Sequence, residues 1–144
     1  MAVCVCLCTR ELAGSLPPEI IWRSAAPEKT YCALCALSAQ EAVRLADHPL
    51  HCDALLVPED LYSPSWQAQQ VVSYGLSPRS SLTLSSMGQR DLLCVQRALT
   101  DCRGRNVEEQ ELCLPARWGV FSPQDRLLLA GTWLLQTGAL PSPE

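Results

Sequence analysis

The first strand-like segment of this chain is apolar on both of its faces. From Val3 to Cys8, valine or leucine alternates with cysteine, and both sets of side chains are hydrophobic. Successive side chains of a strand point to opposite sides, so both sides of this segment must be covered. Strands of this kind are typical of parallel sheets that lie between two layers. A chain that contains such a strand is predicted to fold as an α/β protein.

Further apolar segments and two capped helices extend this prediction. The helices begin at the capping box of Ser38 and Glu41, running to about Asp47, and at Ser122 with Pro123, running to the left-handed cap Gly138. We therefore predict a Rossmann-like, mostly parallel sheet flanked by helices. The other predicted strands of its parallel part are Glu19–Arg23, Tyr31–Leu37, Asp53–Asp60 and a valine-rich strand that starts at Val71.

The second half of the chain also shows antiparallel features. Two segments, Asp91–Leu99 and Val107–Leu114, flank the turn-rich stretch Asp101–Asn106, which predicts an antiparallel β-hairpin excursion. Pro64–Gln70 is predicted to be a short helix or turn, and Ala25–Thr30 a loop. The 144 residues fit one domain. We assign it to residues 1–140, with a βαβ-like part at 1–52, a second part at 53–140, and a tail at 141–144.

Charge and hydropathy exclude several partners. The net charge is −4, and the eleven basic residues form no cluster along the chain, so we expect no nucleic-acid partner. No apolar run is long enough to span a bilayer, so we expect no membrane segment. The first residues lack the basic leader of a secretory signal. These features predict a cytoplasmic protein.

The nine cysteines do not suggest a disulfide framework, because their number is odd and most lie among Val, Leu and Ala. Such cysteines behave as small core hydrophobes. Cys32 and Cys35 have the spacing of a redox or zinc motif, but on a strand, residues three apart are expected to point to opposite faces. We expect no bound metal. A thiol or metal protein that uses Cys32, Cys35 and Cys52 remains an alternative.

The predicted ligand site lies where two neighbouring strands end. Ligands of open α/β sheets bind at the carboxyl ends of the strands. An arginine among hydroxyl groups and free backbone N–H groups, as in the loop from Ser77 to Ser81, can hold a phosphate or a carboxylate. The predicted ligand-binding residues are Glu59, Asp60, Tyr74, Gly75, Ser77, Arg79 and Ser80. We expect a small anionic ligand or a protein partner, and self-association into a homo-oligomer remains open.

The order of the later segments resembles the later part of the central, ATP-binding domain of the Mur ligases. The resemblance rests on Asp53–Asp60, the run from Val71 to Gly75, the hairpin from Leu92 to Leu114, the Leu114-Pro115 pair, and the helix from Leu127 to Gly138. It implies an α/β domain of a ligase fold. Ala116-Arg117-Trp118-Gly119 stands where the family has Gly-x-His-Asn, and the glycine-rich P-loop is missing.

The function expected from the sequence is therefore a non-catalytic, Mur-ligase-like domain that binds a ligand or a protein. No catalytic residue and no cofactor are assigned, and the sequence favours a protein without enzymatic activity. Two alternatives remain. One is a small enzyme or an ATP-using fragment that a partner chain completes, and the other is the thiol or metal protein described above.

Overall fold

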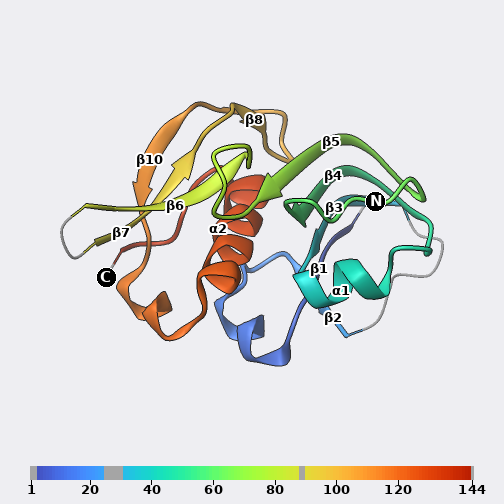
Figure 1. The fold of residues 1–144 in the computed structure, drawn as a ribbon, viewed down its shortest axis with the longest axis horizontal. Coiled ribbons are helices and arrows are strands. Elements are labelled where there is room, and N and C mark those ends of the chain that lie inside the picture. The colour runs from blue at the N-terminus through green and yellow to red at the C-terminus, as the bar shows by residue number, and fades with distance from the viewer. Residues whose placement is uncertain (1–2, 25–30, 88–89, 144) are drawn as a thin grey trace.

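The computed structural model describes residues 3–24, 31–87 and 90–143, and the predicted loop Ala25–Thr30 lies outside them. Within these residues, eight strands form one mixed sheet in the order β10-β7-β6-β5-β4-β3-β1-β2 (Figure 1). The strands of this sheet are β1 (Val3–Leu7), β2 (Ile21–Arg23), β3 (Cys32–Leu37), β4 (Leu50–Pro58), β5 (Trp66–Tyr74), β6 (Leu82–Met87), β7 (Arg90–Val95) and β10 (Gln110–Cys113). The other elements are β8 (Leu99–Thr100), β9 (Asn106–Val107), the α-helices α1 (Ala39–Arg44) and α2 (Pro123–Thr137), and the 3-10 helices η1 (Arg10–Ser15) and η2 (Ala116–Val120).

The sheet has a parallel part and an antiparallel part. Neighbouring strands from β2 through β1, β3, β4 and β5 to β6 run parallel, whereas β6, β7 and β10 form antiparallel pairs. Strands β8 and β9 form a separate antiparallel pair. The α/β class, the mostly parallel sheet and the antiparallel excursion are thus confirmed.

The two faces of β1 are covered by different layers, as its alternating sequence predicts. Cys6 and Cys8 belong to the core cluster that contains the buried side of α2. Val5 and Leu7 belong to a second cluster on the other face, which contains Ala42 of α1. The sheet therefore lies between two hydrophobic layers.

Helix α2 has the caps that its sequence predicts. The Ser122 hydroxyl accepts a hydrogen bond from the Asp125 amide (3.2 Å), and Gly138 ends the helix with a positive φ of 80°. The helix lies against the sheet so closely that a Cβ at Gly131 would lie 2.7 Å from Cδ2 of Leu56. A glycine at this position therefore allows α2 to approach β4.

Helix α1 ends earlier than predicted, at Arg44 instead of about Asp47. Ser38 caps its first turn, because the Ser38 hydroxyl accepts a hydrogen bond from the Glu41 amide. At the other end, the indole N–H of Trp66 donates to the Leu45 carbonyl (2.9 Å). The side chain that closes α1 thus comes from the start of β5.

The prediction of a helix or turn at Pro64–Gln70 is wrong for most of this segment, because β5 already begins at Trp66. Only seven residues separate Pro58 from Trp66, yet the register pairs Leu50 with Trp66, so the chain must return along the length of β4. Eight steps of about 3.3–3.6 Å reach roughly 26–29 Å, and β4 is itself about 26 Å long. A connection this short has no room for a helix, which rises only about 1.5 Å per residue.

The expectation that Cys32 and Cys35 point to opposite faces is also wrong. The ladder between β1 and β3 pairs Val3 with Cys32 but Cys4 with Leu34, so Ala33 is an extra residue. Such a bulge shifts the alternation by one residue. Both cysteines consequently belong to the core cluster on the α1 face.

The predicted hairpin strands are each broken into two pieces. Val107–Leu114 contains β10 and the end of β9, and Asp91–Leu99 contains most of β7 and the start of β8. The loop between β8 and β9 closes around the buried Asp101 carboxylate, which accepts hydrogen bonds from the Arg103 amide (2.9 Å) and the Arg105 amide (3.0 Å). None of the helices described is both long and apolar enough for a membrane crossing.

Candidate functional site

The structure brings together three of the predicted ligand-binding residues at the carboxyl ends of β4 and β5. The Ser80 hydroxyl donates to Oε2 of Glu59 at 2.6 Å. Glu59 also lies over Gly75, where an added Cβ would be 2.4 Å from the Glu59 carboxyl carbon. These groups therefore satisfy one another, and Ser80 is fully buried.

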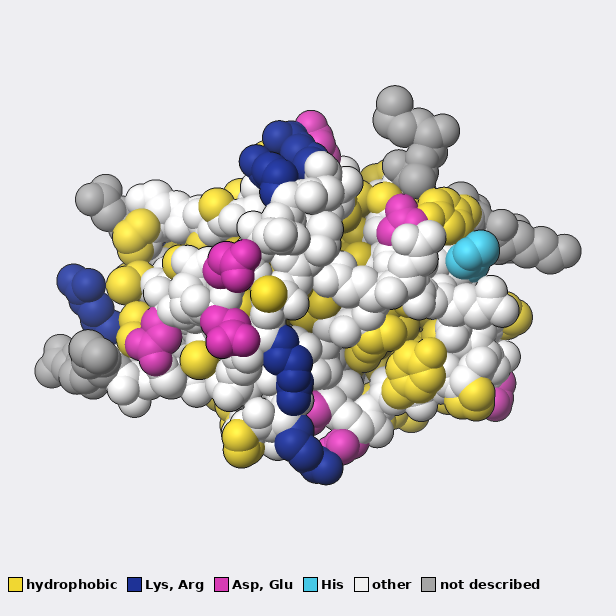
Figure 2. Space-filling view, turned by 90° about the horizontal axis from the view of Figure 1, so that it is seen from above, with side chains coloured by type: hydrophobic (Ala, Val, Ile, Leu, Met, Phe, Trp, Pro, Cys, Tyr) yellow, Lys and Arg dark blue, Asp and Glu magenta, His cyan; other side chains and the backbone are white. Residues whose placement is uncertain are grey.

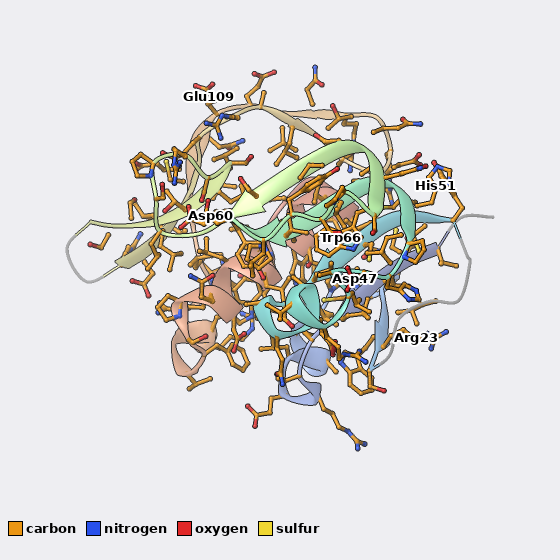
Figure 3. All side chains as sticks on the ribbon, turned by 45° about the vertical axis from the view of Figure 1, so that its right-hand side comes forward. Arg23, Asp47, His51, Asp60, Trp66 and Glu109 are labelled. Atoms are coloured by element: carbon orange, nitrogen blue, oxygen red, sulfur yellow. The ribbon has the colours of Figure 1, made fainter. Side chains whose placement is uncertain are left out.

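Two further predicted residues, Asp60 and Arg79, lie outside this contact on the surface. Arg79 Nη2 is 3.8 Å from Oδ1 of Asp60, and the two side chains are 75% (Asp60) and 80% (Arg79) exposed. An ion pair as exposed as this contributes little to stability. Asp60, labelled in Figure 3, has a positive φ of 65° and marks the sharp turn after β4. The Ser77 hydroxyl accepts a hydrogen bond from the Arg79 amide (3.1 Å), which shapes the loop after β5.

Tyr74, the remaining predicted residue, is buried in the sheet. Its hydroxyl donates to the Leu37 carbonyl at 2.8 Å, which ties the end of β5 to the end of β3. Burial raises the pKa of Tyr74 well above its usual value, so the hydroxyl stays protonated and keeps this hydrogen bond. Tyr74 thus belongs to the hydrophobic core and is separate from the loop that follows β5.

The loop between β5 and β6 joins the two parts of the sheet. Tyr74 and Leu82 are the one pair in the ladder between these strands. Hydrogen bonds between Ser73 and Ser81 continue the contact, and the Gln96 side-chain amide donates to the Ser80 carbonyl at 2.7 Å. Apart from the exposed side chains of Asp60 and Arg79, the polar groups that the sequence offers for a ligand are used here to hold the chain itself.

A cavity of about 590 Å³ lies elsewhere, between the antiparallel strands and the start of α2. We call it the arginine cavity, because two arginines line it. Its walls come from the start of β7, the end of β10, η2, the first turns of α2 and the C-terminal tail. The lining residues are Arg90, Asp91, Cys113, Leu114, Pro115, Ala116, Gly119, Arg126 and Pro143.

The charges in the arginine cavity are only partly balanced. Arg126, whose side chain is 15% exposed, donates through Nη1 to the Asp91 carboxylate, but its Nε is buried and has no hydrogen-bond partner. Arg90 contacts the Cys113 thiol (3.9 Å) and forms no ion pair with any residue described. Two cations and one carboxylate give the lining of this cavity a net charge of +1.

The sequence gives little indication of this cavity. Arg126 lies 35 residues from Asp91, and the two meet only because α2 packs beside the antiparallel strands. The one local signal is Arg126 itself, which directly precedes the apolar run Leu127–Leu129 on the buried side of the predicted helix. That signal alone does not distinguish an arginine beside a cavity from one on the surface.

The three cysteines of the thiol alternative lie on one face of the sheet, in an apolar setting. Cys32 and Cys52 are partners in the ladder between β3 and β4, and Cys35 lies on the same face. Burial, and secondarily the neighbouring Cys32, raises the pKa of Cys52 to about 12. Burial also raises the pKa of Cys35 well above its usual value, so both remain thiols at neutral pH. The described side chains contain no group of three or more His, Cys, Asp or Glu that could hold a metal ion.

No family model matches this sequence, and comparisons with curated proteins and with solved structures also found no match. The resemblance to the Mur ligases therefore stays a prediction.

Proposed function

We propose that this protein is a non-catalytic α/β binding module whose ligand, a small carboxylate or phosphate, binds in the arginine cavity. The observation that carries the proposal is the buried Nε of Arg126, an ionised donor without an acceptor. A buried polar group without a partner costs about 1–3 kcal/mol, and more when it is charged. Nε itself has almost no exposed surface, so an oxygen atom of an anion bound in the cavity would supply the missing acceptor once the Arg126 side chain turns toward the cavity.

Arg90 and the size of the cavity support the same ligand class. Arg90 has no acidic partner among the residues described, so its guanidinium can bind a carboxylate or phosphate through two parallel N–H groups. The volume of about 590 Å³ lies within the range of small-molecule sites. Leu114, Pro115 and Pro143 add apolar walls, which favour an organic anion over an inorganic one.

Asp91 limits the charge that this site accepts. It pairs with Arg126 and leaves one positive charge in excess, so a ligand with one or two negative charges is favoured over a polyanion. We expect Asp91→Asn to tighten anion binding, because the variant removes the negative charge but keeps a side-chain oxygen for Arg126. Arg90→Gln should have the opposite effect.

On the face drawn in Figure 2, the basic side chains of the described residues are interspersed with acidic and neutral ones, which disfavours a large polyanion as the ligand. The net charge of −4 also disfavours nucleic acid. The proposed ligand is therefore a small molecule.

Thermal unfolding with a panel of anions tests this proposal. The panel contains inorganic phosphate, citrate, malonate, glutamate and ATP with magnesium. A ligand at 100 times its Kd stabilises a protein by about 2.7 kcal/mol, which corresponds to a rise in Tm of roughly 8 °C for a chain of this size. We then expect calorimetry to show that Arg90→Gln raises the Kd of the best anion by about 10- to 100-fold, the effect of losing a charge-assisted hydrogen bond.

Arg10→Gln is the matched control, because Arg10 is an exposed arginine of η1 outside the lining of the cavity. This control should leave the Kd unchanged. The proposal is wrong if no anion of the panel raises Tm, or if Arg10→Gln and Arg90→Gln weaken binding equally. Turnover of ATP by the protein alone would also contradict it.

A further inference from the structure

Two cysteines that lie far apart in the sequence meet at the amino ends of the parallel strands. Cys4 is on β1, and Cys102 follows β8, 98 residues later. Their sulfur atoms are 3.9 Å apart, within thiol hydrogen-bond distance. Because the two residues are so far apart along the chain, only the folded structure brings them into contact.

The backbone on both sides of this thiol pair is fixed. Cys4 lies in the ladder between β1 and β3, opposite Leu34. The Cys102 amide donates to the Leu135 carbonyl at 2.7 Å, which anchors the loop after β8 on α2. The buried Asp101 carboxylate organises the same loop. Since the two sulfur atoms of a disulfide lie about 2.05 Å apart, side-chain rotation has to bring them about 2 Å closer.

The position of Cys102 makes the pair accessible. Cys102 is exposed and lines a cavity of about 430 Å³, together with Asp53, Gln70 and Thr100. Cys6 and Cys8 form another close thiol pair, at 3.7 Å, but both are buried and only two residues apart on the same chain segment. The Cys4–Cys102 pair thus differs from the Cys6–Cys8 pair in two ways: it includes an exposed cysteine, and its members are far apart along the chain.

We propose that Cys4 and Cys102 form a reversible intramolecular disulfide when the protein meets hydrogen peroxide. This modification site is independent of the anion site proposed above, because neither cysteine lines the arginine cavity. Hydrogen peroxide is small enough to reach Cys102 through the cavity that this residue lines, and Cys4 beside it is only half-buried.

The chemistry balances with one molecule of peroxide. The Cys4 thiolate attacks one peroxide oxygen, the O–O bond breaks, and hydroxide leaves, so that Cys4 becomes a sulfenic acid. The Cys102 thiolate then attacks the Cys4 sulfur, the S–S bond forms, the S–O bond breaks, and a second hydroxide leaves. The two thiol protons convert the two hydroxides into water. Two thiols are oxidised and one peroxide is reduced.

The hydrogen bond between the thiols favours Cys4 as the first nucleophile. This bond lowers the pKa of Cys4, against the opposing effects of burial and of Glu19. The same bond raises the pKa of Cys102, as do burial and the charges of Cys4, Asp101 and Asp53. Cys102 is therefore the resolving thiol, and it loses its proton during the second step.

Peptide mapping of the full chain tests the proposal. Reduced protein is treated with hydrogen peroxide, the remaining thiols are blocked, and the protein is digested with trypsin without reduction. Cleavage at arginine gives the peptides 1–10 and 98–103, which carry Cys4 and Cys102. We expect a mass for these two peptides joined by one disulfide, a monomer on a non-reducing gel, and loss of the link on treatment with dithiothreitol.

Three variants assign the bond. Peptide 1–10 also contains Cys6 and Cys8, so Cys4→Ser has to abolish the link. Cys102→Ser changes an exposed residue and has to abolish it as well. Cys94→Ser is the matched control, a half-buried cysteine outside the pair, and should retain it. A link that survives Cys4→Ser, a link from Cys4 to another cysteine, a disulfide between two chains, or peroxide damage at Cys94 before any link forms would each overturn the proposal.

Discussion

Raising the pH is predicted to unfold this protein through its buried thiols. Cys35 and Cys52 are each 1% exposed in the core cluster on the α1 face. Burial, followed by the charge of Cys32, raises the pKa of Cys52 from 9.0 to about 12. Burial, followed by the charges of Cys52 and Cys32, raises the pKa of Cys35 well above 9.0. In the unfolded chain both thiols ionise near their ordinary pKa.

The sign and size of the effect follow from proton linkage. Well below pH 9 both thiols are protonated in either state, so their contribution to stability is fully present. As the pH rises above about 9, the unfolded state loses protons that the folded state retains, and each thiol removes about 1.4 kcal/mol of stability per pH unit. At about pH 10.5 the two thiols together have removed roughly 4 kcal/mol, against a total of about 5–15 kcal/mol for a typical domain. For Cys52 the loss ends near pH 12.

Urea unfolding followed by circular dichroism measures this loss. The protein is kept reduced, and the free energy of unfolding is determined at steps between about pH 8 and about pH 10.5. We expect the slope to increase through this range and to approach about two protons near pH 10.5, equal to about 2.7 kcal/mol per pH unit. The variant Cys52→Ala should reduce the slope by about one proton.

Leu55→Ala is the control for this experiment. Leu55 is fully buried on the same face but does not ionise, so its truncation should cost about 2–5 kcal/mol at every pH and leave the slope unchanged. Stability that stays constant up to about pH 10.5, or the same slope in Cys52→Ala, would refute the reasoning. Such a result would mean that these thiols ionise readily in the fold, which favours the alternative of a thiol or metal protein.

Two further predictions concern packing. Trp66→Phe leaves the Leu45 carbonyl without its indole donor, so it should lower the free energy of unfolding by about 1–3 kcal/mol. A loss below about 0.5 kcal/mol in urea unfolding would contradict this expectation. Gly131→Ala places a methyl group 2.7 Å from Cδ2 of Leu56, and the clash should cost about 1–3 kcal/mol, more than the gain of about 1 kcal/mol in helix propensity. A rise in Tm of Gly131→Ala would instead show that α2 can move away from β4.

Features specified by neighbouring residues could be predicted from the sequence. The alternation in β1 requires apolar cover on both faces, and the structure has that cover. Ser122 and Gly138 end α2 through contacts within a few residues, so their types alone indicate the caps. The α/β class follows from such local signals taken together.

Features that depend on distant residues could not be predicted in the same way. The first half of β5 contains Gln67, Gln69 and Gln70, which do not resemble a buried strand. It is a strand because β4 supplies its hydrogen-bond partners from Leu50 onward, and because the short connection forces the chain back along β4. No property of the segment itself carries that information.

The bulge at Ala33 shows a second limit. A strand pattern read with a strict period of two places Cys32 and Cys35 on opposite faces, and one extra residue reverses the conclusion. The β3–β4 and β4–β5 ladders also omit Asp53 and Gln69, at the level of the cavity beside Cys102. The irregular pairing thus places Cys32 and Cys35 on one face and accompanies a cavity, and neither feature follows from the sequence pattern.

The predicted site and the arginine cavity differ in what an anion would have to displace. The loop after β5 has the residue types that bind an anion, but Ser80 already donates to Glu59, and Gln96 already donates to the Ser80 carbonyl. An anion would have to replace these bonds before it gained its own. In the arginine cavity the Nε of Arg126 has no bond to lose, so an acceptor there adds a contact without breaking one. The unsatisfied donor, more than the residue types, therefore indicates where a ligand binds.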